Sequence, residues 1–201
     1  MNVFEGKENM ISIVKTQPFM DQKPGTSGLR KKVTHIQQQN YLENFVQAMF
    51  DQLSESEKTL LIIGGDGRFY NDKAIQCIVK IAAANDIKRI VVGQNGILST
   101  PAVSNLIRQH SAGGGVILSA SHNPGGPDGD FGIKFNNANG SPAPEAFTEA
   151  LYLSTQNLHE YRLAQGGDVD LSTIGTSDLN GMEIDVIDAV IDYNGLMQQS
   201  F

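Results

Sequence analysis

The chain has 201 residues, enough for one large domain or two small ones, and 40% of them are apolar, as in a folded globular protein. With 22 acidic and 15 basic side chains, the formal net charge is −7, which argues against nonspecific binding to nucleic acid or to anionic membranes. Apolar runs fall short of the ~20 residues that span a bilayer, and residues 1–10 lack the pattern of a secretory signal. We therefore expect a cytoplasmic protein with no nucleic-acid partner and no membrane partner.

Short runs of β-branched and apolar residues predict strands. They lie at residues 11–15, 60–63, 89–92, 116–118 and 131–135. Between the first two runs, apolar residues recur three and four positions apart, the spacing that places side chains on one face of a helix. These residues are Leu42, Phe45, Val46, Met49, Phe50 and Leu53. The spacing predicts a helix that packs this face against a hydrophobic core.

Two further helices are expected in the same half of the chain. The first runs from about Asp72 to Ala84 and contains Cys77, whose apolar neighbours predict a core residue rather than a reactive thiol. The second begins at Pro101, where Ser99 or Thr100 can cap it, and the glycines at 113–115 are expected to end it. Four residues share its predicted core-facing side: Val103, Leu106, Ile107 and His110.

The alternation of strands and helices predicts an α/β fold with a mixed, largely parallel sheet covered by helices on both faces. In the last third of the chain we expect a helix from about Pro144 to Leu158, then a polar stretch. The alternation of Met182, Ile184 and Val186 with acidic residues predicts a further strand. After Asp188 the apolar spacing becomes helical again, which predicts the start of another helix.

Several glycine-rich segments follow the predicted strands, where parallel α/β sheets bind their ligands. They are residues 64–68, 93–100 and 119–126, and residues 23–30 form a similar segment near the start of the chain. Glycines allow backbone N–H groups to approach a ligand, and side chains here can donate hydrogen bonds to phosphate oxygens. The candidate donors are Thr26, Ser27, Arg30 and Arg68. The pattern favours an oxyanion ligand, most plausibly phosphate, although each segment alone is also typical of an ordinary turn.

Ser121 is the candidate nucleophile, because it lies two residues beyond a buried strand and next to His122. The Gly-x-Ser-x-Gly pattern of esterases and the Walker A pattern of nucleotide-binding loops are both absent. A turn with incidental hydroxyls is an equally good interpretation of the residues alone. The run Asp128-Gly-Asp130 lacks the remaining spacing of a calcium loop, so we interpret it as a solvated turn.

Residues 119–136, SASHNPGGPDGDFGIKFN, resemble the active-site serine segment of the α-D-phosphohexomutase family, in the longer form of its phosphoglucomutase branch. The resemblance extends, in the order of the family, to residues 23–30, 64–68, 96–104 and 142–145. One departure is Ser119, where this branch usually has threonine, a change that keeps a hydroxyl.

The resemblance implies an isomerase that interconverts glucose 1-phosphate and glucose 6-phosphate through a phosphoserine and a glucose 1,6-bisphosphate intermediate. Ser121 would carry the phosphoryl group and bind Mg²⁺ through its phosphate, while His122 or Lys134 would move protons. Arg30 would neutralise charge, and Thr26, Ser27, Arg30 and Arg68 would contact substrate or phosphate. We expect the local cationic pocket of this acidic chain at Arg30, His122 and Lys134. Without the resemblance, His122 and Lys134 would be interpreted as an exposed turn residue and an outward-facing strand residue.

The family has four domains, and these residues resemble the first one only, so we expect domains 2 to 4 in a longer parent protein. Residues 1–188 would form domain 1, and residues 189–201 would begin the helix that leads to the second domain. The Asp-Gly-Asp-Gly-Asp magnesium loop of the family does not occur in the 201 residues. We therefore expect little or no mutase turnover from this chain alone. Two alternatives stay open: a mutase-derived protein that only binds phosphosugars or partners, and a fragment of a phosphomannomutase.

Overall fold

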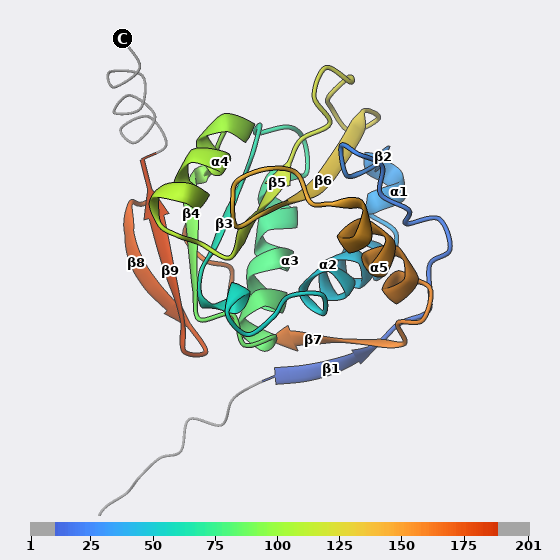
Figure 1. Ribbon diagram of the computed structural model, residues 1–201, viewed down its shortest axis with the longest axis horizontal. Coiled ribbons are helices and arrows are strands. Elements are labelled where there is room, and N and C mark those ends of the chain that lie inside the picture. The colour runs from blue at the N-terminus through green and yellow to red at the C-terminus, as the bar shows by residue number, and fades with distance from the viewer. Residues whose placement is uncertain (1–10, 189–201) are drawn as a thin grey trace, which may run out of the picture.

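A computed structural model describes residues 11–188, which form a seven-stranded mixed sheet with helices packed against it (Figure 1). From one edge to the other the strands are β2 (Leu29–Lys32), β6 (Asp130–Asn137), β5 (Gly114–Leu118), β3 (Leu61–Gly65), β4 (Arg89–Ile97), β9 (Met182–Ile187) and β8 (Gly175–Leu179). The order β5–β3–β4–β9 is parallel, and the pairings outside it are antiparallel. The predicted mixed α/β sheet is confirmed, and its parallel part is the centre.

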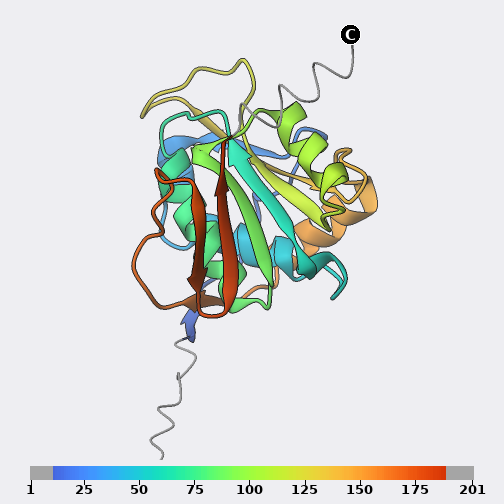
Figure 2. The same cartoon turned by 90° about the vertical axis from the view of Figure 1, so that its left-hand side faces the viewer.

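The central strands are those whose sequences are apolar without alternation. All residues of β3 and β5 are buried, because the strands have neighbours on both sides and packed side chains on both faces. Edge strand β8 is largely exposed and polar by contrast. Figure 2 shows β8 and β9, in red, at the outer edge of the sheet beside β4.

Helices cover the two faces of the sheet unequally. One face packs against α1 (Val33–Ile36), α2 (Tyr41–Phe50), α3 (Asn71–Ala84) and α5 (Glu145–Thr155), whereas α4 (Thr100–Gln109) packs against the other. The predicted stripe is confirmed on α2 for five residues, and the sixth, Leu53, is also buried but lies beyond the end of the helix at Phe50. Cys77 of α3 packs against the same core, and burial raises the pKa of its thiol well above the ordinary value, which agrees with a core residue.

Helix α4 begins as predicted and ends differently. The Ser99 hydroxyl accepts a hydrogen bond from the Ala102 N–H at 3.3 Å, and Pro101 occupies the first turn. His110 does not share the buried face, because it is the exposed residue that follows the last turn. The glycines do not end the helix either: Gly114 and Gly115 belong to β5, and a Cβ at Gly114 would lie 2.3 Å from the Phe135 ring. Close packing against β6 is the reason for glycine there.

The predicted strand at residues 11–15 forms, but outside the main sheet. It is β1 (Ile11–Lys15), which pairs antiparallel with β7 (Glu160–Ala164) in a separate two-stranded sheet. Helix α5 ends at Thr155, three residues before the predicted end. The predicted helix after Asp188 lies outside the described residues. None of the helices within residues 11–188 is long and apolar enough to cross a lipid bilayer.

Candidate active site

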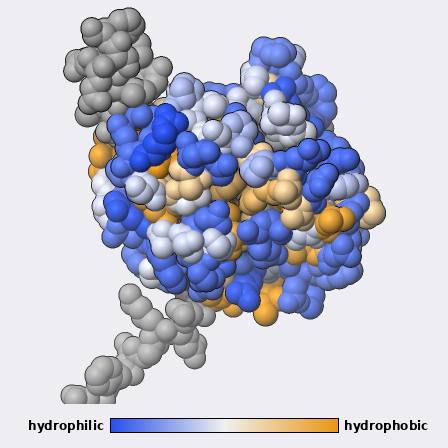
Figure 3. Space-filling model, viewed as in Figure 1, coloured by the Kyte–Doolittle hydropathy of each residue, from blue (hydrophilic) through white to orange (hydrophobic). Residues whose placement is uncertain are grey.

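The loops that follow β3 and β5 lie together at the C-terminal ends of these two parallel strands, which form one end of the sheet. The Asp66 N–H donates to the Leu118 carbonyl at 3.0 Å, which fixes the start of one loop against the end of the other strand. The chain between β5 and β6, residues 119–129, projects from this end of the sheet as a long loop, the serine loop (Figures 1 and 2). Hydrophilic residues cover this projection (Figure 3). The predicted nucleophile is therefore presented to solvent at the ligand-binding edge of the fold.

Ser121 lies in this loop in a conformation that side chains rarely adopt. It is exposed and has a φ of 55°, in the left-handed region. Its N–H donates to the Ser119 hydroxyl at 3.0 Å. Ser119 can approach β6 closely because Gly132 has no side chain, and a Cβ there would lie 2.1 Å from the Ser119 carbonyl oxygen. Unusual backbone conformations held in place by their surroundings are common at functional sites.

Arg30 is the cation in direct contact with the predicted nucleophile. It lies on β2 opposite Gly132, and its Nη2 donates to the Ser121 hydroxyl at 3.0 Å. The Nε of Arg30 is buried and has no hydrogen-bond partner within residues 11–188. A buried donor without an acceptor is costly, and an oxyanion beside Ser121 would satisfy it. The structure therefore places Arg30, one of the three cations of the predicted pocket, next to Ser121, and its role stays a prediction.

Arg68 reaches the same loop from the end of β3. Its Nη2 donates to the Ser121 carbonyl at 3.1 Å, and its Nη1 donates to the Asp130 carbonyl at 2.7 Å. Asp66 accepts from the Nε and from Nη2 of the same guanidinium, at 3.0 and 2.8 Å. Only 8% of the Arg68 side chain is exposed. The guanidinium therefore contacts the backbone of the loop, whereas Arg30 contacts the hydroxyl.

Asp66 is a site residue that the sequence analysis did not single out. Partial burial raises its pKa, but hydrogen bonds from Arg68 and Ser119 outweigh burial and hold the pKa of the carboxyl below its ordinary value. Asp66 thus holds the Arg68 guanidinium, which in turn contacts the Ser121 carbonyl. The spacing Asp-Gly-Arg after a buried strand is the one signal in the sequence that could have indicated this pair.

Thr26 and Ser27 occupy the tip of a tight turn beside β6. Gly25 and Gly28 exchange backbone hydrogen bonds of 3.0 and 2.9 Å across the turn, which leaves both hydroxyl side chains exposed. Gly28 has a φ of 85°, and a Cβ there would lie 2.3 Å from the Ile133 carbonyl oxygen. Glycine at this position allows the turn to press against β6 next to Lys134.

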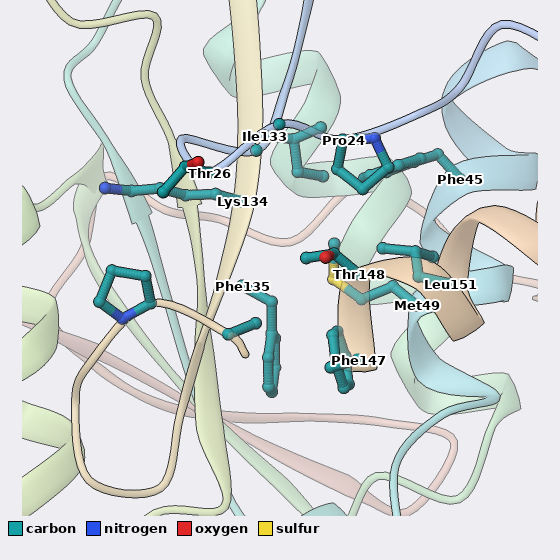
Figure 4. Close-up of a pocket in the computed structure, with 14 residues that line it drawn as sticks. Pro24, Thr26, Phe45, Met49, Ile133, Lys134, Phe135, Phe147, Thr148 and Leu151 are labelled. Atoms are coloured by element: carbon teal, nitrogen blue, oxygen red, sulfur yellow. The ribbon is translucent and has the colours of Figure 1, made fainter. Parts of the chain in front are cut away.

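Lys134 lies on β6 and lines a small cavity together with Thr26 (Figure 4). The cavity holds about 20 Å³, and its far side is closed by the stacked rings of Phe135 and Phe147, whose centroids are 5.0 Å apart. Burial lowers the pKa of the Lys134 ammonium, and the nearby charge of Arg30 lowers it further. A lysine with a lowered pKa can release and accept a proton more readily than an exposed one.

His122 and Asp128 are exposed in the projecting loop. Within residues 11–188 the His122 ring makes no hydrogen bond or ion pair, so its predicted proximity to Arg30 and Lys134 stays a prediction. In the predicted solvated turn at Asp128-Gly-Asp130 only Asp128 is exposed, because Gly129 is buried and Asp130 begins β6 and pairs with Lys32 at 2.8 Å.

The segment 93–100 was expected to follow the third strand of the chain. Instead β4 continues through Ile97, with a shift of register beside β3, and only the last residues lie beyond the strand. A Cβ at Gly93 would lie 2.1 Å from the Ile97 carbonyl oxygen, so glycine allows the strand to bend back closely on itself here. The prediction of a ligand loop beginning at Gly93 is corrected.

Comparison with known proteins identifies the family. Residues 21–162 match the family model described as phosphoglucomutase/phosphomannomutase, alpha/beta/alpha domain I. A phosphoglucomutase of Rhizobium radiobacter is 53% identical over 192 residues, which are 96% of this chain and 35% of that protein. A phosphoglucomutase of Schizosaccharomyces pombe is 51% identical over 193 residues, again 96% of this chain and 35% of the relative.

Among solved structures, the open form of the exocytosis-sensitive phosphoprotein pp63/parafusin, a phosphoglucomutase from Paramecium, is similar with a TM-score of 0.90 and 47% identity. The match covers 95% of this chain and 37% of that one. The chain thus spans about a third of the length of the relatives it matches. The matched region, the mixed sheet and the serine loop agree: the chain belongs to the phosphoglucomutase/phosphomannomutase family and contains its domain I.

Proposed function

We propose that this chain is the serine-bearing domain of a phosphoglucomutase, an isomerase that interconverts glucose 1-phosphate and glucose 6-phosphate. The observation that carries the proposal is the environment of Ser121: its hydroxyl accepts from Arg30 at 3.0 Å, and the same guanidinium holds a buried donor without a partner in residues 11–188. A phosphoryl group on Ser121 would give that donor an acceptor. The relatives named phosphoglucomutase support the choice of reaction.

In the proposed reaction, the bond between phosphorus and the Ser121 oxygen breaks as a hydroxyl of the hexose monophosphate forms a new bond to phosphorus. The hydroxyl loses its proton, and the serine oxygen leaves as an alkoxide that must be protonated or neutralised. The resulting glucose 1,6-bisphosphate then returns its other phosphoryl group to Ser121. Phosphoryl transfer depends mainly on positioning and charge neutralisation, which Arg30 is placed to supply.

Proton transfer and phosphate binding fall to neighbouring residues in this proposal. Lys134 is the first candidate for the proton carrier, because burial and Arg30 lower the pKa of its ammonium, and His122 is the second candidate. Thr26 and Ser27 present hydroxyls at the tip of the turn beside Lys134, where they can donate to substrate oxygens. Arg68 is a phosphate ligand only by prediction from the sequence.

The family implies a metal ion, for which Mg²⁺ is our proposal. Magnesium prefers about six oxygen ligands, several of them from carboxylates or phosphates. Residues 11–188 contain no cluster of three histidine, cysteine, aspartate or glutamate side chains that could hold a metal. Asp66 and Asp130 are engaged by Arg68 and Lys32. These residues do not form a complete Mg²⁺ site, and the contribution of this chain would be the phosphate oxygens on Ser121.

The choice between glucose and mannose phosphates is open within the family, since the matching model covers both kinds of mutase. We favour glucose because the relatives with 53% and 51% sequence identity are named phosphoglucomutases. A binding protein without chemistry is the other alternative. A cytoplasmic location also stays a prediction.

Intact mass spectrometry tests the proposal. The chain is incubated with glucose 1,6-bisphosphate, and we expect a single phosphate adduct in the parent that Ser121→Ala lacks. Ser111→Ala is the matched control, because Ser111 is also exposed and has a φ of 50°, and it should keep the adduct. An adduct that persists in Ser121→Ala would contradict the assignment of the phosphoryl carrier. No adduct in the parent would favour the binding protein.

A further inference from the structure

The two arginines at Ser121 differ in what they contact. Arg68 donates to the carbonyl of Ser121 through Nη2 and to the carbonyl of Asp130 through Nη1. The first carbonyl lies where the loop leaves β5, and the second lies where the loop returns into β6. One planar guanidinium therefore joins the two stems of the serine loop, which a flexible point charge could not do with the same geometry.

The donor capacity of Arg68 is almost exhausted by these contacts. A guanidinium has five N–H bonds, and here one from Nε, one from Nη1 and two from Nη2 have protein acceptors, which makes four. The side chain is 8% exposed, and Asp66 neutralises its charge in a bidentate ion pair. Only one N–H, on Nη1, is left for a ligand, so binding a phosphate through two N–H groups would require Arg68 to give up a bond to Ser121, Asp130 or Asp66.

Arg30 has the opposite properties. Its contact is with the side chain of Ser121 and not with the backbone, and its buried Nε is free of partners in the described part of the chain. An arriving phosphoryl group can use that donor without breaking a protein hydrogen bond. The site thus contains one arginine available to a ligand and one that is committed to the loop.

We infer that Arg68, together with Asp66, is a positioning residue that holds both stems of the loop and keeps Ser121 in its left-handed conformation, and that it is not a phosphate ligand. The hydrogen bond from the Ser121 N–H to the Ser119 hydroxyl, at 3.0 Å, fixes the same residue from its other side. This inference deepens the proposed function, because positioning matters only if Ser121 carries the phosphoryl group. Its tests, however, require no phosphoryl transfer.

The first test measures solvent exchange of backbone amides by NMR in the full 201-residue chain. Lysine at position 68 keeps the charge and loses the planar fork, so we expect the Ser121 N–H to exchange about tenfold faster in Arg68→Lys. Arg30→Lys is the matched control and should change this rate by less than about twofold, because Arg30 does not bind the loop backbone. A Ser121 rate in Arg68→Lys within twofold of the parent would overturn the inference.

Amides of β3 serve as the internal reference for folding. If Ile62 and Ile63 also exchange faster in Arg68→Lys, the variant is globally destabilised, and the test is then whether the Ser121 rate rises by a larger factor than the rates of these two amides. Asp66→Asn is examined in the same way, because asparagine keeps the size of the side chain but removes the charge that holds the Arg68 Nε. A larger acceleration at Ser121 than at the β3 amides supports the inference in either variant, and an equal acceleration contradicts it.

The second test follows the arginine Nε–H signals of the unmutated chain as inorganic phosphate is added. The Arg68 signal should stay in place, because its Nε already donates to Asp66, and any phosphate-induced shift should occur at Arg30. A shift of the Arg68 signal that saturates with phosphate would contradict the inference. Failure of the proposed function would be seen separately, as the absence of a phosphate adduct on Ser121 in the mass spectrum.

Discussion

Two glycine-containing segments lie at the same edge of the sheet, and only one of them forms a site. Segment 119–129 projects from β5 and carries Ser121, whereas segment 93–97 is the folded end of β4. In the first, a Cβ at Gly125 or Gly126 would meet no atom within 4 Å. In the second, a Cβ at Gly93 or Gly96 would lie 2.1 and 2.4 Å from other residues. Glycine thus gives freedom at the tip of the first segment, whereas at Gly93 and Gly96, and at Gly129 where the first segment ends, it permits close packing.

The neighbours of the two segments explain the difference. Segment 119–129 receives Arg30 from β2 and Arg68 from the end of β3, so charged side chains converge on it. Segment 93–97 is bound instead by residues 171–172, through the Asn95 N–H at 2.6 Å and the Gln94 amide at 2.7 Å. A glycine-rich turn beyond a strand thus indicates a ligand site only where side chains of neighbouring strands point to it. The variants below test whether one segment governs stability and the other governs the site.

The largest effect on stability is expected from Gly93→Ala. The added Cβ would overlap the Ile97 carbonyl oxygen and approach Leu98 within 2.7 Å, and neither backbone nor packed side chain can move away cheaply. We expect a loss of about 3 kcal/mol in the free energy of unfolding, measured with urea. Gly125→Ala is the control and should change it by less than about 0.5 kcal/mol. Equal losses in both variants would contradict the comparison.

Asp66→Asn should have a smaller effect that depends on pH. The carboxyl has a pKa below its ordinary 3.8 in the folded chain, since the bonds from Arg68 and Ser119 outweigh burial. A carboxyl whose pKa is lowered by folding stabilises the folded chain at pH values above its pKa in the unfolded chain. This stabilisation is lost as the pH falls through its pKa in the folded chain. The side chain is 34% exposed and therefore screened, so we expect a loss of about 1.5 kcal/mol at pH 6.

The difference in the free energy of unfolding between Asp66→Asn and the parent is measured with urea from about pH 2.5 to about pH 6, on both sides of the ordinary aspartate pKa of about 4. The gap between them should narrow below pH 3.8. Asp128→Asn is the control, because Asp128 is exposed in the same loop and has no ion pair within residues 11–188. A gap that does not change with pH would show that the charge of Asp66 has no part in stability.

Ser99→Ala addresses the segment that follows the end of β4. The hydroxyl caps α4 by accepting from Ala102, and its removal leaves that N–H without an acceptor at the start of the helix. We expect a loss of about 1 kcal/mol in the free energy of unfolding. Ser99→Thr keeps a hydroxyl and should recover most of it. The phosphate adduct on Ser121 should form in both variants, since this segment does not contact the serine loop through the cap.

Local patterns predicted the elements whose cause is local. The stripe of α2 follows from the spacing of residues within 12 positions of one another, and the cap at Ser99 follows from residues three apart. The strand β1 was also predicted, but its partner β7 was not, because residues 160–164 contain no β-branched run and their pairing depends on contacts 145 residues away in the chain. The antiparallel edge strands β2 and β8 were also not predicted, because their pairing likewise has no local sequence signal.

The candidate site shows the same division. Ser121, Arg30 and Lys134 could be named from the sequence because a long motif carries them. The role of Arg68 could not, since its two carbonyl acceptors lie 53 and 62 residues further along the chain and carry no sequence signal of their own. Any residue can provide a carbonyl. Positioning contacts to the backbone are therefore visible only once the strands have been paired.

The smallest effect is expected at Lys134, and its sign is opposite to the others. Burial, aided by the charge of Arg30, lowers the pKa of the ammonium below its ordinary 10.5, so the charged form is disfavoured in the folded chain. The unfolded chain then binds the proton more tightly, and the stability of the parent rises as the pH passes from the folded pKa towards 10.5. Lys134→Met should therefore stabilise the chain at pH 7 by about 0.5 kcal/mol.

This gain should shrink as urea unfolding is repeated towards pH 10.5, where the parent lysine is neutral in the folded chain. Arg30→Gln should raise the pKa of Lys134, measured from its side-chain NMR signals, because it removes the second cause of the shift. A residue whose removal stabilises the fold is kept for another reason, and Lys134 lies beside the turn that presents Thr26. If Lys134→Met instead destabilises the chain at pH 7, Lys134 belongs with the packing residues of the segment 93–97 and not with the site.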